Sequence, residues 1–316
     1  MTNSIHQHHT VPAARFAVLG HPVAHSRSPR MHEANFAALG LDATYEAFDV
    51  TEADLAERLD ALQRAEYTGL NLTIPLKARA LELVDEATPQ ACFLGGVNTL
   101  LFRADGSRLG DNTDGFGFLM ALRDAGVPKL TGQRTLLLGC GGTGRALALT
   151  CARAGIGELT LANRTIARAE AVAGAVRAAF PSLEVHVLQS DPEAWRHAAQ
   201  SSDLIVHTTS QGLGADDAPL LTREAFHPGQ LIFDAIYTAE KTPILREAGA
   251  AGARGINGLG MLVHQGAQSF RIWTGREPDL EAMRRGVRGY IHEKRTASAC
   301  FVLVLVLVLD NPAVHL

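Results

Sequence analysis

A glycine-rich turn between an apolar segment and a helical segment constrains the fold of this chain more than any other feature. The segment TLLLGCGGTGRALAL, residues 135–149, opens with an apolar run typical of a buried strand, and four glycines then permit a tight turn. The helix after the turn would present free N–H groups and its positive dipole end to an anion. The segment therefore predicts a strand, a phosphate-binding turn and a helix, with a purely structural turn as the alternative.

Strand-like and helix-like segments alternate on both sides of this turn. The first series is RFAVLG, SPRMHEANFAALG, TYEAFDV, TEADLAERLDALQR and YTGLNLTIP, and a second series of the same kind begins near residue 114. The chain has 316 residues, about twice the length of a typical single domain. We therefore expect an α/β protein of two domains, the first with a largely parallel sheet and the second a doubly wound, Rossmann-type domain.

Composition excludes several classes of function. The formal net charge is -4 and the basic residues are spread along the chain, so no basic stripe for nucleic acid is present. The four cysteines lack CxxC spacing, which argues against a zinc site or a disulfide framework and favours a reducing cytoplasm. We expect no metal and no membrane partner.

The two ends of the sequence differ from the rest. The start, MTNSIHQHHTVPAA, does not resemble an export signal, and we expect a disordered lead-in, with weak metal affinity of its three histidines as the alternative. The apolar run 301–309 is too short to span a membrane. A strand, an interface segment and an aggregation-prone appendage all remain open for it, and a membrane-associated role is the less favoured hypothesis.

The strand after the glycine turn suggests which dinucleotide binds. The segment ELTLANRT ends in Asn163, Arg164 and Thr165, and Arg168 follows one helical turn later, with no acidic residue at the strand end. An NAD site usually has an acidic residue there to bind the ribose 2′-hydroxyl, whereas a guanidinium suits a 2′-phosphate. NADP is therefore the expected cofactor, and solvated charges at a helix start are the alternative.

Polar residues gather at three places in the first domain. Ser26 and Ser28 precede a helix, where hydroxyls and free N–H groups can hold a carboxylate, although helix capping would explain one serine. Asn71 and Thr73 alternate on a short strand and so share one face. Lys77 follows that strand, and a lone lysine there is usually solvated. Asn98 lies on a further turn, where amides often satisfy backbone groups.

The stretch LGDNTDGFG places Asp114 where the first series of elements gives way to the second. Ligand sites favour such domain junctions. Capping of the helix that begins near residue 115 is the structural alternative, and the two roles are compatible.

The motifs GHPVAHSRSP, LNLTIPLK, GGVNTL, GDNTDGFG, LLLGCGGTGRA, NRT and NGLGMLVHQGAQSFRIWTG occur in an order that resembles the shikimate dehydrogenase family, from about residue 15 to about 275. The resemblance implies a substrate domain over 13–113, completed by helices within 258–295, and an NADP domain over 114–257, with 1–12 and 296–316 as tails. It implies NADPH-dependent reduction of 3-dehydroshikimate to shikimate by a monomer or homodimer.

The resemblance also implies a role for each matching position. Lys77 matches the catalytic lysine and Asp114 its partner. The substrate carboxylate would bind Ser26 and Ser28, and its hydroxyls would bind Asn71, Thr73, Asn98, Asp114 and Gln265, with Tyr237 nearby. The pyrophosphate would lie on Gly139, Cys140, Gly141, Gly142 and Thr143. The adenosine ribose phosphate would lie among Asn163, Arg164, Thr165 and Arg168, and the nicotinamide end beside Ala235 and Gly258.

A reduced ketone oxygen must gain a proton, which a lysine ammonium beside it can supply. We expect Lys77 to carry this proton and Asp114 to orient Lys77 and the substrate hydroxyl. A nearby carboxylate favours a charged lysine and desolvation opposes it, so both charge states remain open. Two alternatives also remain: a quinate/shikimate dehydrogenase using NAD or NADP, and a non-catalytic NADP-binding sensor.

Two internal positions depart from the family pattern. Many members have NATSxG where this chain reads HTTSQGLG, so that His207 replaces a small amide near the expected cofactor groove and puts the local geometry in doubt. Glu33 follows His32 where many members carry Asn. The apolar run at the end of the chain is a further departure.

Overall fold

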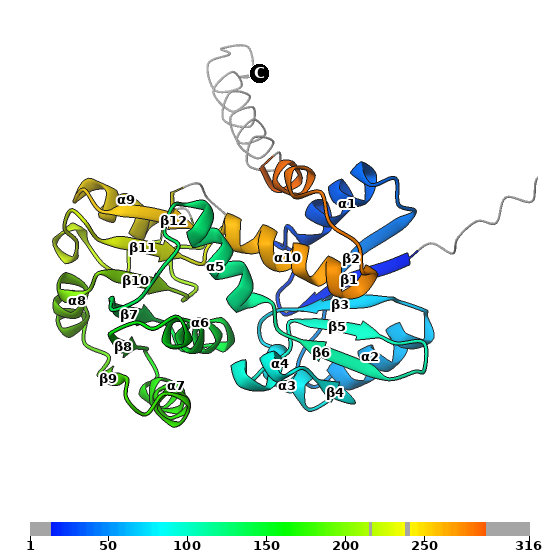
Figure 1. Cartoon of the computed structure of the whole chain (residues 1–316), viewed down its shortest axis with the longest axis horizontal. Coiled ribbons are helices and arrows are strands. Elements are labelled where there is room, and N and C mark those ends of the chain that lie inside the picture. The colour runs from blue at the N-terminus through cyan, green and yellow to red at the C-terminus, as the bar shows by residue number, and fades with distance from the viewer. Residues whose placement is uncertain (1–13, 215–216, 238–240, 289–316) are drawn as a thin grey trace, which may run out of the picture.

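The computed structural model describes residues 14–214, 217–237 and 241–288, which form two lobes, each built on a six-stranded sheet (Figure 1). The two terminal segments discussed above, with the histidine cluster and the apolar run, lie outside the described residues. Among the described helices, none combines the length and the apolar character needed to cross a membrane.

The first lobe holds a sheet of strand order β2-β1-β3-β5-β6-β4. Its strands are β1 (Ala14–Gly20), β2 (Ala43–Asp49), β3 (Gly69–Leu72), β4 (Glu86–Ala87), β5 (Thr99–Phe102) and β6 (Arg108–Asp111). Its helices are α1 (Ser28–Ala38), α2 (Leu55–Arg64), α3 (Lys77–Leu81) and α4 (Pro89–Leu94).

Alternation along β1 divides the core of this lobe into two layers. Phe16 and Val18 face the aromatic cluster that includes Phe36 of α1, whereas Ala17 and Leu19 face the aliphatic cluster that contains the buried leucines of α2. Successive side chains of a strand point to opposite faces, so a strand buried on both faces is apolar throughout. The run RFAVLG therefore forms a central strand covered on both sides.

The expectation of a largely parallel first sheet is confirmed, with β5 as the one reversed strand. Strands β1, β2 and β3 are parallel, but β5 is antiparallel to both β3 and β6. The connection between β5 and β6 is a short turn with Gly106 at a φ of 86°, which permits a hairpin and leaves no room for a crossover helix. The first sheet is therefore mixed.

The second lobe holds a fully parallel sheet of order β12-β11-β10-β7-β8-β9, which confirms the predicted doubly wound arrangement. Its strands are β7 (Arg134–Leu138), β8 (Glu158–Ala162), β9 (Glu184–Leu188), β10 (Leu204–His207), β11 (Leu231–Asp234) and β12 (Arg254–Asn257). Its helices are α6 (Gly142–Arg153), α7 (Ile166–Ala179), α8 (Pro192–Ser201), the 3-10 turn η1 (Arg223–Ala225) and α9 (Pro243–Ala250).

Two helices connect the lobes. Helix α5 (Asp114–Asp124) leads into the second lobe and α10 (Leu259–Thr274) leads back, and they pack against each other between the two sheets (Figure 1). A Cβ at Gly117 would lie 2.7 Å from the Met261 carbonyl oxygen, so glycine is required for this close packing.

The end of α10 packs on the first sheet, as expected. The Trp273 indole stacks on Phe16, with ring centroids 5.0 Å apart, and its Nε1 donates to the Leu100 carbonyl at 2.9 Å. A final helix begins at residue 280 and is described as far as 288.

Candidate functional site

A buried ion pair joins helix α3 of the first lobe to helix α5, which leads into the second lobe. Lys77 is the first residue of α3, and Asp114 is the first residue of α5. The Lys77 Nζ donates to Asp114 Oδ2 at 2.5 Å, and the two side chains are only 10% and 5% exposed. Buried charges are stable only when paired, so each group requires the other. The lone-lysine alternative, in which Lys77 is solvated, is therefore wrong.

The second oxygen of Asp114 is held by Asn98. Asn98 Nδ2 donates to Asp114 Oδ1 at 2.8 Å, and Asn98 Oδ1 accepts from the Thr113 backbone N–H at 2.9 Å. The residue before α5 is Thr113, and no side chain caps this helix. The capping alternative for Asp114 is therefore wrong, because both carboxylate oxygens bind side chains of the first lobe.

Lys77 also reaches the second lobe. Its Nζ lies 3.3 Å from the Oγ1 of Thr143, which belongs to the first turn of α6. The ammonium is thus bounded by a carboxylate on one side and by the glycine turn on the other. This arrangement places a buried amino group where the two lobes meet.

A network of buried amides and hydroxyls lies beside this pair. Asn71 Nδ2 donates to the Asn98 carbonyl at 3.1 Å and to Ser269 Oγ at 2.9 Å, while Asn71 Oδ1 accepts from the Tyr45 hydroxyl at 2.7 Å. Ser269 Oγ lies 2.7 Å from Thr99 Oγ1. The Asn71 amide is therefore oriented by strands β2 and β5 and by helix α10.

Sequence reasoning missed four members of this network: Tyr45, Thr99, Thr113 and Ser269. A signal existed for two of them. Ser269 follows Gln265 by four residues, which places both on one face of a helix, and Thr113 directly precedes Asp114.

Burial raises the pKa of Tyr45 well above its ordinary value, so its hydroxyl stays a donor to Asn71.

Ser26, Ser28 and Thr73 are the other residues of the first lobe that are expected at the substrate. Ser26 Oγ accepts from the Ser28 backbone N–H at 3.3 Å, and Ser28 is only 6% exposed. The residue directly before α1 is Arg27 and not a serine, and its side chain does not cap the helix. Thr73 follows β3 and is half-buried. The Ser26 hydroxyl thus binds the first N–H of α1, whereas helix capping does not account for Ser28.

Gln265 and Tyr237 approach from the other side. Gln265 Oε1 lies 3.5 Å from Asn98 Nδ2, and its Nε2 donates to the Leu262 carbonyl at 3.0 Å. Burial raises the pKa of Tyr237, and the Arg27 guanidinium lies 5.8 Å from the centre of its ring. Tyr237 follows β11, and Gln265 lies in α10, which follows β12.

The glycine turn has the shape that a dinucleotide phosphate requires. Gly139 has a φ of 99°, and a Cβ at Gly141 would meet no atom within 4 Å, so open space lies against the backbone there. The first helical hydrogen bond of α6 runs from the Arg145 backbone N–H to the Gly141 carbonyl, at 2.8 Å. The N–H groups before it at the helix start therefore lack a helical acceptor and suit an anion.

Two side chains complete this turn. Asn163 Oδ1 accepts from the Cys140 backbone N–H at 3.0 Å, and Asn163 Nδ2 donates to the Thr165 carbonyl at 2.8 Å, so Asn163 connects the ends of β7 and β8. Burial raises the pKa of the Cys140 thiol to about 12. The thiol is therefore protonated at neutral pH and is not a nucleophile.

Arg164, Thr165 and Arg168 lie exposed at the start of α7. Within the described part of the chain neither guanidinium forms an ion pair. Both are available for a ligand phosphate. Ala235 and Gly258 lie at the ends of β11 and β12, and so close together that a Cβ at Gly258 would collide with the Ala235 carbonyl.

The doubt about His207 is resolved. Its ring is 0% exposed and its Nδ1 lies 2.9 Å from Asp234 Oδ1, so it does not project from the sheet end as an exposed ligand of a cofactor. Among the described residues, no three His, Cys, Asp or Glu side chains are arranged to hold a metal ion.

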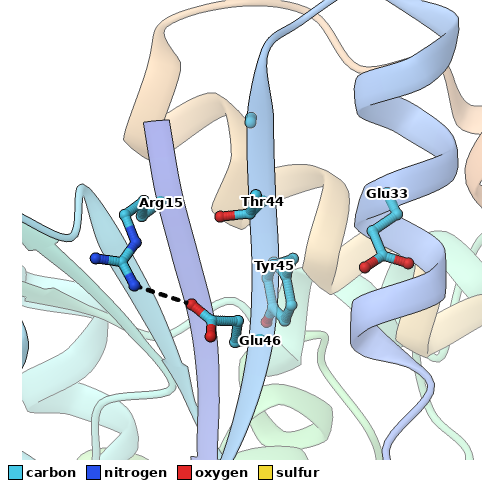
Figure 2. Close-up of a pocket in the computed structure, with 6 residues that line it drawn as sticks. Arg15, Glu33, Thr44, Tyr45 and Glu46 are labelled. Carbon is cyan, nitrogen blue, oxygen red and sulfur yellow. Dashed lines mark hydrogen bonds and ion pairs between the residues drawn. The ribbon is translucent and has the colours of Figure 1, made fainter. Parts of the chain in front are cut away.

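A separate depression lies beside the edge strand β2 (Figure 2). Figure 2 shows Arg15 of β1 paired with Glu46 of β2, and Glu33 on α1. The Arg15 guanidinium lies 3.3 Å from the Glu46 carboxylate. Tyr45 contributes its ring, while its hydroxyl binds Asn71. None of the residues expected at the substrate or the cofactor lines it. The lining residues are Arg15, Glu33, Ala43, Thr44, Tyr45 and Glu46.

Comparison with known proteins covers both lobes. Residues 18–100 match the model of the shikimate dehydrogenase substrate binding domain. Residues 121–222 match the model of shikimate / quinate 5-dehydrogenase, and residues 258–288 match that of the shikimate 5'-dehydrogenase C-terminal domain. A curated relative from Methanosarcina mazei, a shikimate dehydrogenase (NADP(+)), is 41% identical over 274 residues, which are 86% of this chain and 96% of the relative.

Solved structures agree with this match. The shikimate 5-dehydrogenase of Thermus thermophilus in complex with NADP(H) and shikimate is 41% identical, with a TM-score of 0.76 over 87% of this chain and 98% of that one. The quinate dehydrogenase of Corynebacterium glutamicum in complex with NAD is 30% identical, with a TM-score of 0.80 over 88% of this chain and 99% of that one.

Proposed function

We propose, on the premise that this chain belongs to the shikimate dehydrogenase family, that it catalyses the reversible NADPH-dependent reduction of 3-dehydroshikimate to shikimate. It is then an NADP-dependent oxidoreductase that acts on a CH–OH group. The observation that carries the proposal is the buried Lys77–Asp114 pair, which lies beside the glycine turn through the contact of Lys77 with Thr143.

Lys77 is the proposed proton carrier. Its Nζ holds a proton between a carboxylate and the second lobe, in a place from which most water is excluded. A proton donor at this position neutralises the negative charge that grows on the ketone oxygen during reduction. In the reverse direction the same nitrogen accepts the proton of the substrate hydroxyl.

Asp114 is the proposed orienting group. It fixes the Lys77 ammonium through Oδ2, while Asn98 fixes the carboxylate through Oδ1. Ser26 and Ser28 are proposed to bind the substrate carboxylate. The proposed hydroxyl-binding residues are Asn71, Thr73, Asn98, Asp114 and Gln265, with Tyr237 beside them.

NADPH, when bound, supplies the hydride. Its pyrophosphate is proposed to bind the free N–H groups at the start of α6, beside Gly141, where a Cβ would meet no atom within 4 Å. Arg164 and Arg168 are proposed to bind the 2′-phosphate, with Asn163 and Thr165 beside them. Ala235 and Gly258 are proposed to lie at the nicotinamide end.

Residues 13–113 and the helices within 258–295 are proposed to form the substrate domain, and residues 114–257 the NADP domain. The described cysteines are free, which suits the reducing cytoplasm that we propose for this enzyme. We propose a monomer or a homodimer, which sedimentation analysis would distinguish.

The test is an absorbance assay at 340 nm with shikimate or quinate as the substrate and NADP+ or NAD+ as the cofactor. We expect the highest kcat/KM with shikimate and NADP+. A higher kcat/KM with quinate would replace this proposal by a quinate/shikimate dehydrogenase, and tight NADP+ binding without turnover on either acid would leave a non-catalytic sensor.

A further inference from the structure

A buried histidine–aspartate pair joins the ends of two strands in the second lobe. His207 and Asp234 are the last residues of β10 and β11, and they are direct partners in the parallel register. Their side chains are both 0% exposed, with His207 Nδ1 2.9 Å from Asp234 Oδ1. Neither residue belongs to the reaction proposed above, so the pair requires its own explanation.

Asp234 is fully satisfied on its other sides. The Ile236 backbone N–H donates to Asp234 Oδ1 at 3.0 Å, and the Thr242 hydroxyl donates to Oδ2. Thr242 directly precedes α9. Because a buried carboxylate is costly unless hydrogen-bonded, these contacts tie Ile236 and Thr242 to the end of β11. They also leave the imidazole in one orientation.

The far nitrogen of the imidazole holds Thr209. His207 Nε2 lies 2.5 Å from Thr209 Oγ1, a hydrogen bond across the first residues after β10. Thr209 lies directly over the glycine turn: a Cβ at Gly139 would lie 2.8 Å from the Thr209 Cγ2 and 3.0 Å from its backbone nitrogen. The neighbouring Thr208 hydroxyl donates to the Gly139 carbonyl at 2.8 Å. The position of the turn thus depends on residues 208 and 209.

This contact lies at the point where a doubly wound sheet binds its ligand. Strand β10 is the neighbour of β7 on the side opposite β8, so the chain order reverses between β7 and β10. Dinucleotides bind at the carboxyl ends of the strands at such a reversal. The Thr209 contact therefore shapes one wall of the site where the pyrophosphate is proposed to bind.

We propose that His207 and Asp234 are positioning residues of the cofactor site, which fix Thr209 against the glycine turn and thereby set the affinity for NADP without contacting it. This inference rests on the proposed cofactor. It assigns a role to the histidine that stands where many relatives have a small amide. In a relative with the small amide, other contacts would have to hold the residues after β10 against the glycine turn.

The test is a double-mutant cycle on NADP+ binding, measured by calorimetry on the full chain without substrate. His207→Asn keeps a donor near the Nδ1 position, for Asp234, but the shorter side chain ends before Thr209. Thr209→Val removes the hydroxyl and keeps the shape. We expect each single variant to bind NADP+ roughly fivefold more weakly, about the effect of one hydrogen bond, and the double variant to be little weaker than either.

His264→Asn is the matched control. His264 forms a comparable histidine–aspartate pair with Asp124, at 2.8 Å, but joins α10 to α5 and does not touch the glycine turn. We expect its NADP+ affinity to equal that of the wild type. We also expect KM for shikimate to be unchanged in His207→Asn and Thr209→Val, since a general loss of structure would raise it as well.

Wild-type affinity for NADP+ in both single variants would overturn the inference, and so would strictly additive effects or an equal loss of shikimate affinity. Should His207→Asn fail to fold, Thr209→Val alone still decides, because it leaves the buried pair intact. A wild-type chain that does not bind NADP+ at all would instead refute the proposed cofactor, so the two failures are distinguishable.

Discussion

The Nζ of Lys77 lies 2.5 Å from Oδ2 of Asp114, although the two residues are 37 positions apart in the chain. One begins the short helix after β3, and the other begins the helix that leaves the first lobe. The pair therefore depends on the tertiary fold that brings the starts of α3 and α5 together. Its burial makes it the centre of the proposed chemistry.

Asp114→Asn should lower kcat by roughly 10²-fold and also raise KM for shikimate, because the amide no longer fixes the ammonium or accepts a strong hydrogen bond from the substrate. Steady-state kinetics and shikimate titration would measure the two effects. NADP+ affinity serves as the internal control and should not change. An unchanged kcat would show that Asp114 has no orienting role.

Lys77→Ala should lower kcat by roughly 10²- to 10⁴-fold, the contribution typical of a proton carrier. The change also leaves Asp114 buried without its partner, which costs about 3–5 kcal/mol, so circular dichroism must first show that the variant is folded. Lys129→Ala, at an exposed lysine, is the matched control. Near-normal turnover in a folded Lys77→Ala variant would refute the assignment.

Gly141→Ala should weaken NADP+ binding by at least about tenfold while the melting temperature of the free protein stays nearly constant. The added methyl group meets no protein atom within 4 Å and occupies the space through which the backbone approaches a pyrophosphate. Gly144→Ala is the contrast, since its Cβ would collide with the Gly139 carbonyl. We expect it to lower the free energy of unfolding by about 1–3 kcal/mol. Equal NADP+ affinity in Gly141→Ala and wild type would argue against a phosphate site here.

Replacing Arg164 and Arg168 together by Ala should weaken NADP+ binding by roughly tenfold or more and leave NAD+ binding unchanged, because only NADP+ carries the 2′-phosphate. Calorimetric titration with both cofactors measures this difference. Arg246→Ala, at an exposed arginine of α9, controls for a general change of charge. Unchanged NADP+ affinity would favour the alternative of solvated helix-start charges, and an equal loss for both cofactors would argue against a 2′-phosphate contact.

His32 should make the protein less stable in mild acid. Burial lowers the pKa of this histidine from 6.5 to about 3, and neither ring nitrogen has a hydrogen-bond partner among the described residues. Below pH 6.5 the unfolded chain therefore binds a proton that the folded chain does not. Stability from this group is present above pH 6.5 and falls toward pH 3, by at most about 1.4 kcal/mol per pH unit.

Urea unfolding at several pH values between about 4.5 and 7.5 tests this effect. We expect His32→Leu to lose less stability on acidification than the wild type. The slope of its unfolding free energy against pH should be smaller by the equivalent of about one bound proton. Equal slopes in wild type and His32→Leu would contradict the assignment.

Local patterns of the sequence determined the order of the helices and strands, the doubly wound second sheet and the glycine turn. Apolar periodicity and turn residues act over a few positions, so they are readable without knowledge of the fold. The same patterns did not reveal that β5 runs antiparallel to β3, because the connection between these two strands contains α3, β4 and α4 and does not fix the direction of β5.

The side-chain partners were decided by the tertiary structure alone. Asp114 was identified at the domain junction by sequence, but its bonds to Lys77 and Asn98 depend on strand register and helix docking. His207 stood out as a departure from the family pattern, yet only the register of β10 with β11 placed it against Asp234. Sequence determines which groups are available within each element, and long-range packing determines which of them meet, because the energy of a buried polar contact depends on atoms from segments far apart in the chain.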